Sequence, residues 1–205
     1  LKKVGKFAGG IMLISVIAAI NTQLDKLSIS KLLKIEELGY YTLSVSLAQG
    51  IITLVLPFST ALLPRFTALF STNAKTEAIS LFHKMSMLVS ILIFSFLAMF
   101  IFFSKEIFWV WTGNNVITHK TEALLPLIAT SYAMMSLSMM FYDIAIANGY
   151  TRANNIIGVI ALFVTIPGYW FFIKIYGTLG AAILYCVVQS LITISYIFII
   201  NKKFI

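Results

Sequence analysis

Six long runs of apolar residues, separated by short polar segments, dominate the pattern of hydrophobic and polar positions along this chain. Each run is continuous, without the alternation that marks the strands of a membrane barrel. The predicted spans cover about residues 7–33, 43–63, 85–103, 123–147, 156–173 and 179–200. Because about 20 apolar residues cross the hydrocarbon core, the pattern predicts an all-α integral membrane bundle of six transmembrane helices.

The overall composition leads to the same class. Hydrophobic residues make up 60% of the 205 residues, only 11% are charged, and the mean hydropathy is +0.97. A soluble domain is about 45–50% apolar and about 25% charged, so a soluble protein is excluded. The net charge of +8 lies mostly beside the spans. We therefore interpret it as a determinant of orientation in the bilayer and expect no nucleic-acid partner.

The basic residues predict a topology with both ends of this segment in the cytoplasm. The positive-inside rule then places nine of them inside: Lys2, Lys3, Lys6, Arg65, Lys75, Lys84, Arg152, Lys202 and Lys203. Five face outward: Lys31, Lys34, Lys105, Lys120 and Lys174. Lys26 remains inside the first span.

The first span carries the adjacent charges Asp25 and Lys26. A charged side chain at the centre of a membrane helix costs roughly 2.5–3.5 kcal/mol on insertion scales. Asn21 and Asp25 form one row at helical spacing, and Thr22 and Lys26 form a second row beside it. These rows predict a helix that lines a polar cavity. Two alternatives are an ordinary hydrogen-bonded helix seam, and charges that have already left the membrane.

The second span adds a polar face and a basic residue at its inner end. Gln49, Thr53 and Pro57 follow one another at helical spacing, and Pro57 predicts a kink. Arg65 follows at the predicted inner interface, either in the substrate path or as a topology anchor.

Asp143 lies near the inner end of the fourth span. We predict that it belongs to the ion or substrate path, with Arg152 or Arg65 as a partner.

The chain lacks the standard enzyme signatures. It contains no HExxH, Walker A or GxSxG sequence, no cysteine cluster, and a single cysteine, Cys186. We therefore expect no enzyme activity, no bound metal and no cofactor.

Two segments of the chain resemble a known family. Residues 21–41, from Asn21 to Tyr41, are similar to the seventh helix of Wzx-type O-antigen flippases and the loop after it, and Ala61-Leu-Leu-Pro-Arg65 is similar to the end of the eighth. These flippases belong to the multidrug/oligosaccharidyl-lipid/polysaccharide exporter superfamily. The resemblance covers essentially the whole chain, but only its first 65 residues are specific.

The resemblance implies that residues 1–205 form the C-terminal six-helix lobe of a twelve-helix, MATE-like transporter. Such proteins carry an undecaprenyl-diphosphate-linked glycan across the bacterial inner membrane through a cationic cavity between two lobes. Asp25 matches the family's acidic residue and Arg65 its Pro-Arg position. A cavity lined by Asn21, Lys26 and Gln49 would offer hydrogen-bond donors to phosphate and sugar, and Asp25 would bind H+ or Na+. Membrane lipid and the enzymes of glycan polymerisation are the expected partners.

Other functions remain open from the sequence. A multidrug or cation antiporter of the same superfamily is the nearest alternative, and a membrane scaffold that does not transport is another. An intramembrane glycosyltransferase or polymerase would usually need a larger outer loop than residues 104–122. The chain begins with Leu, so we expect a fragment whose missing part lies upstream and which does not transport alone.

Overall fold

The computed structural model describes residues 2–204, with side chains from residue 9 onward except residue 14. Every element in this part of the chain is a helix. Five helices are long: α1 (Lys2–Leu32), α2 (Ile35–Ser71), α3 (Lys75–Phe102), α6 (Leu124–Ala147) and α7 (Thr151–Phe204). Two are short: α4 (Ser104–Thr112) and α5 (Asn115–Thr121). The five long helices are apolar and long enough to cross a membrane.

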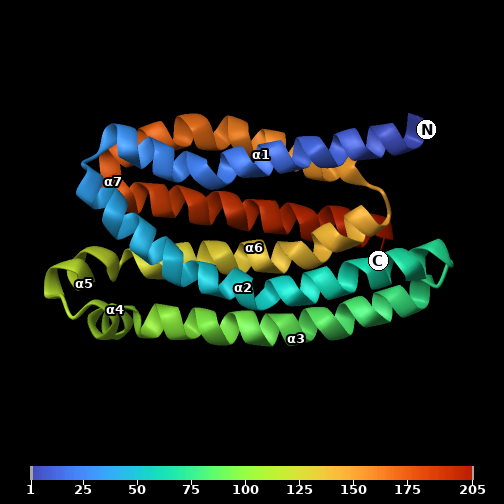
Figure 1. Cartoon of the computed structure of the whole chain (residues 1–205), viewed down its shortest axis with the longest axis horizontal. Helices are drawn as coiled ribbons and strands as arrows, with labels where there is room; N and C mark the ends of the chain where they lie inside the picture. The colour runs from blue at the N-terminus through green and yellow to red at the C-terminus, as the bar shows by residue number, and fades with distance from the viewer. Residues whose placement is uncertain (1, 205) are drawn as a thin grey trace.

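Helix α7 is two antiparallel segments joined at one residue. Gly177 has φ 61° and ψ −140°, a backbone conformation that only glycine adopts readily. The chain reverses there, so residues 151–176 and residues 178–204 run in opposite directions (Figure 1). The predicted fifth and sixth spans lie in these two halves.

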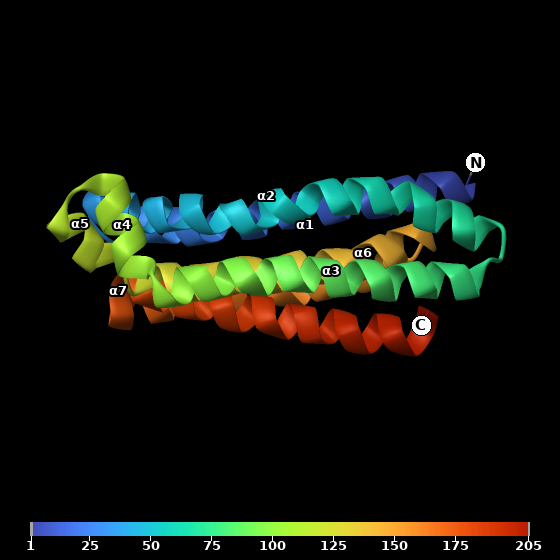
Figure 2. The same ribbon diagram turned by 90° about the horizontal axis from the view of Figure 1, so that it is seen from below.

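Helix α6 forms the centre of the bundle and packs against α2, α3 and α7. Helix α1 packs mainly against α7. Gly158 of α7 leaves room for the Ile17 side chain, because a Cβ at Gly158 would lie 2.7 Å from Ile17 Cγ2. Figure 2 shows α1 and α2 in one layer and α3, α6 and the second half of α7 in the other. The α1–α2 layer therefore has one covered side and one open side.

The links between helices gather at two ends of the bundle (Figure 1). The α1–α2 link, α4, α5 and Gly177 lie at one end, which the sequence predicts to face outward. The α2–α3 link, the α6–α7 link and the two ends of the chain lie at the other. The structure thus separates the predicted inner and outer residues, and which side each end faces stays a prediction.

The predicted outer loop, residues 104–122, is largely helical. Gly113, at φ 62°, ends α4, and the Asn114 side chain caps α5 by accepting from the backbone N–H groups of Val116 and Ile117. The Lys120 ammonium donates to Glu37 at 3.0 Å and ties α5 to the first turn of α2. This contact with the Glu37 carboxylate raises the pKa of Lys120.

The cap of α5 gives a first prediction. Replacing Asn114 with alanine leaves two N–H groups without their partner, so we expect a loss of about 1 kcal/mol in unfolding free energy. Thermal unfolding of the purified protein measures this loss. Asn115→Ala is the matched control, because Asn115 lies inside the helix and its side chain does not cap it. Equal melting temperatures for the two variants would contradict the capping role.

Candidate functional site

The open side of α2 carries a row of small and polar residues, flanked by the exposed apolar residues Leu54 and Leu56. Its inward side consists of buried residues such as Tyr41, Val45, Ala48, Val55 and Phe66. On the opposite side, at helical spacing, lie the exposed residues Ser46, Gly50, Thr53, Pro57, Thr60 and Pro64. A helix that faced lipid on this side would carry large apolar residues there.

The other outer helices do carry such residues. Exposed positions of α3 include Met87, Ile91 and Phe94, and those of the first half of α7 include Phe163, Ile166 and Trp170. These surfaces suit hydrocarbon, and the side of α2 does not. The hydroxyls of Ser46, Thr53 and Thr60 donate to backbone carbonyls of their own helix and keep lone pairs free to accept. This side of α2 therefore suits contact with water or a polar surface better than the exposed sides of α3 and α7 do.

Helix α1 lies in the same layer as α2 (Figure 2) and carries Lys26. Lys26 is half-buried and pairs with no acidic residue in the described part of the chain, and Thr22 lies one turn before it. Gln49 is exposed on α2. We call the surface made by Thr22, Lys26, Ser46, Gln49, Thr53 and Thr60 the polar face. Lys26 is the one charged residue among these six, so the polar face carries a single positive charge.

A cavity of about 360 Å³ lies among α1, α6 and α7. Its walls come from α1, α6 and both halves of α7, with Ile52 from α2. Asn21 and Thr22 line it, as do further polar residues from the other helices: Asn154, Thr165, Tyr169 and Gln189. We call it the interior cavity. The Asn21 side chain links α1 to the first half of α7. Its amide nitrogen lies 3.5 Å from the Gly158 carbonyl oxygen, and its Oδ1 lies 3.4 Å from the Thr165 hydroxyl.

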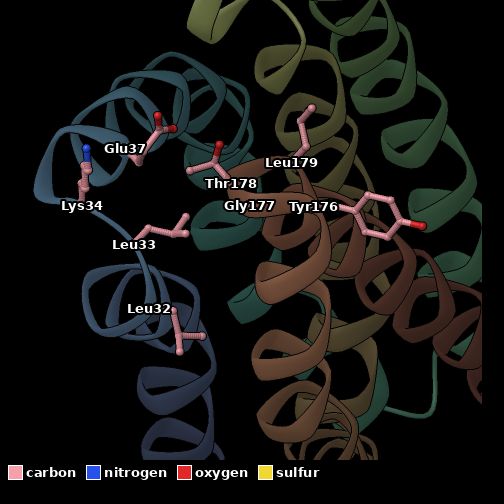
Figure 3. A pocket seen from close by; sticks show the side chains of 8 residues that line it. All are labelled: Leu32, Leu33, Lys34, Glu37, Tyr176, Gly177, Thr178 and Leu179. Carbon is pink, nitrogen blue, oxygen red and sulfur yellow. The ribbon is translucent and has the colours of Figure 1, made fainter.

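A second pocket, of about 560 Å³, lies at the C-terminal end of α1, between the α1–α2 link and the turn at Gly177 (Figure 3). Figure 3 shows Lys34 and Glu37 on the α2 side, with Thr178 and Leu179 across from them. The Glu37 carboxylate already accepts from Lys120. Lys34 also lines this pocket and pairs with no acidic residue in the described part of the chain. The pocket lies at the end of the bundle, whereas the interior cavity is lined by Asn21 and Thr22 of the first span, so we place the candidate site at the polar face and the interior cavity.

Asp25 is buried inside the bundle, one turn from Asn21. Only 5% of its surface is exposed, and its Oδ2 accepts a hydrogen bond from the Tyr41 hydroxyl at 2.9 Å. The side chain of Lys26, the next residue, is half-buried and forms no ion pair with it. The two adjacent charges thus occupy different environments.

Residues 1–117 match the sequence model of a family described as polysaccharide biosynthesis protein. The chain belongs to this family. The match spans α1 to α4 and the beginning of α5, and so includes Asp25 and the whole polar face. No curated protein matches the chain, and no solved structure matches it. With five helices long and apolar enough to cross the bilayer, this polysaccharide biosynthesis protein is a multi-pass membrane protein.

Two predicted residues of this family member lie away from the interior cavity. Arg65 is exposed near the end of α2 where the termini lie. Asp143, which lies beyond the matched residues, is buried in α6 beside Ser59 and has no hydrogen-bond partner at Oδ2. Among the described residues Asp143 forms no ion pair with Arg152 or Arg65, so the expected pairing was wrong: Arg65 is exposed and Arg152 partly so, while Asp143 is buried in the core.

Several residues of the site were not identified from the sequence. Tyr41 holds Asp25 from the neighbouring helix, while Tyr169 and Asn154 line the interior cavity with buried polar atoms that have no partner. One signal was present: a polar side chain within an apolar span usually faces a partner or a cavity. Applied to Asn154 and Tyr169, this rule would have added both residues to the predicted site.

Proposed function

We propose that this polysaccharide biosynthesis protein is a flippase that moves an undecaprenyl-diphosphate-linked oligosaccharide across the bacterial inner membrane. In this proposal the chain forms one six-span lobe of a larger, MATE-like transporter. The glycan and its diphosphate cannot cross hydrocarbon unaided, so the path needs a wet, polar wall. The transporter catalyses no covalent step and needs no cofactor.

The polar face is the observation that carries the proposal. Ser46, Gln49, Thr53 and Thr60 lie along the open side of α2, and Lys26 adds an ammonium group without an acidic partner in the described residues. Such a surface supplies hydrogen-bond partners to sugar hydroxyls and a cation to the diphosphate. Arg65 lies on the same helix near the end that we predict to be cytoplasmic, where a lipid-linked diphosphate would arrive.

Asp25 gives the transport cycle a site for a coupling ion. Its carboxylate is buried and hydrogen-bonded to Tyr41, next to the interior cavity. Intramembrane carboxylates of this kind bind protons or cations in many transporters. We propose that H+ or Na+ binding at Asp25 drives the exchange between inward-open and outward-open states.

Complementation of a flippase-deficient bacterium tests the proposal. The full-length protein is expected to restore surface glycan, and Lys26→Gln is expected to lower it about tenfold at unchanged membrane abundance. Lys31→Gln is the matched control, because Lys31 is an exposed lysine of the same helix outside the polar face.

Two results would count against flipping. A well-expressed wild-type protein that restores no glycan in several glycan backgrounds would favour drug or cation export. Equal losses for the Lys26 and Lys31 variants would remove the polar face from the mechanism.

A further inference from the structure

The walls of the interior cavity carry many polar groups and no charged group. All of the residues that line it are neutral, and the four tyrosines Tyr142, Tyr169, Tyr185 and Tyr196 contribute aromatic rings. Asn21, Asn154 and Gln189 contribute side-chain amides. The cavity therefore combines flat apolar surfaces with neutral hydrogen-bonding groups, the mixture that gives a ligand pocket its specificity.

Two of these side chains are buried in the cavity wall without a hydrogen-bond partner among the described residues. Asn154 is 4% exposed and both its Oδ1 and Nδ2 are unpaired, and Tyr169 is 1% exposed with an unpaired hydroxyl. Buried polar groups normally have partners, so both sites point to a hydrogen-bonding occupant. Fifteen residues separate them on one helix, which at about 1.5 Å per residue places them about 22 Å apart. The occupant is therefore an extended molecule.

The cavity opens toward the polar face. Ser15 and Thr22 of α1 line it and are also exposed, and Lys26 lies one turn beyond Thr22. A molecule that moves along the polar face thus passes the mouth of the cavity.

We propose that the interior cavity binds a run of uncharged sugar units, which makes the carried glycan neutral in the part that enters this cavity. This inference rests on the proposed flippase function and names its substrate class. Sugar rings present C–H faces that pack on the tyrosine rings and hydroxyls that satisfy the amides and Tyr169. A hydrocarbon chain would leave Asn154 and Tyr169 unpaired, and a sugar acid would bring a carboxylate into a cavity wall without a cation.

Protection of a cysteine at the cavity mouth tests this inference. The full-length Cys186→Ala protein carrying Ser15→Cys is placed in lipid nanodiscs and labelled with a maleimide. Ser15 is an exposed residue of the cavity wall and lies outside the polar face, away from the Lys26 ammonium group. We expect neutral trisaccharides (maltotriose, cellotriose and mannotriose, each at millimolar concentration) to include at least one that slows labelling about fivefold. Trigalacturonate, with the same number of rings and three carboxylates, is expected to have no effect. Thr60→Cys, on the polar face outside the cavity, is the matched control and is expected to label at an unchanged rate.

Variants of the two unpaired residues locate the binding site. Asn154→Leu is expected to abolish the protection, and Tyr169→Phe, which keeps the ring and is the safer variant for folding, is expected to weaken it about threefold. The inference is overturned if no neutral trisaccharide protects, if trigalacturonate protects equally, or if decanol protects instead. Labelling requires no transport, so protection without glycan export would leave the sugar site intact and count against flipping alone.

Discussion

Replacing Gly180 with alanine is expected to destabilise the protein by about 3 kcal/mol or more, by forcing apart the two halves of α7. Gly180 lies three residues after the reversal at Gly177, where the chain passes close to the end of the first half. A Cβ added there would lie 2.1 Å from the Phe172 carbonyl oxygen and 2.6 Å from its carbon. Both atoms belong to the backbone of a packed helix, so no side-chain rotation relieves the clash. The melting temperature and folded yield of the purified protein measure the effect.

Gly50→Ala is the matched control for this prediction. Gly50 lies inside α2 on the polar face, and a Cβ there would meet nothing within 4 Å. Alanine favours helix over glycine by about 0.5–1 kcal/mol, so this variant is expected to be as stable as the wild type or slightly more stable. If Gly180→Ala melted as high as Gly50→Ala, the close packing at the turn would play no part in stability.

The second large effect is expected from Asp25→Asn, which should reduce surface glycan by tenfold or more while membrane abundance stays constant. Asparagine has nearly the shape of aspartate, and its side-chain oxygen still accepts the hydrogen bond from Tyr41. It carries no negative charge and cannot take up a proton or hold a cation, so the coupling step proposed for Asp25 is lost. Glycan export in the flippase-deficient bacterium, normalised to abundance, is the measurement.

Asp25→Leu separates coupling from structure. Leucine removes the acceptor and leaves the Tyr41 hydroxyl buried without a partner, which costs about 1–3 kcal/mol and is expected to lower abundance as well. If the protein were a scaffold that does not transport, the Asp25→Asn variant would either behave as the wild type does or differ from it only in membrane abundance. Normal export by an abundant Asp25→Asn protein would restrict Asp25 to a packing role.

Much of the fold followed from the length of the apolar runs. The predicted spans lie in the helices that cross the bundle, because a run of about 20 apolar residues has few other stable structures in a bilayer. Helix ends were harder to predict. Helix α2 continues to Ser71, beyond Pro57 and Pro64, and residues 104–122 form α4 and α5. Proline is tolerated in membrane helices when neighbouring groups compensate, and those groups come from tertiary structure.

The site was predictable in its residue types but not in its division into two environments. Helical spacing grouped Asn21 with Asp25 and Thr22 with Lys26, and the structure places Asp25 in the core and Thr22 on the open side. The burial of Asp25 depends on Tyr41, which belongs to another helix, so no spacing within the first span reveals it. The contacts of Asn154 and Tyr169 depend in the same way on how α1 and α7 pack.

The reversal at Gly177 also has a consequence for how the protein is made. The two halves of α7 are joined by one residue, so no free loop allows the first half to settle in the bilayer before the second arrives. We therefore expect the 54 residues of α7 to enter the bilayer as one hairpin, with lateral release into lipid after synthesis of the second half. Nascent chains arrested before that point would remain associated with the translocon.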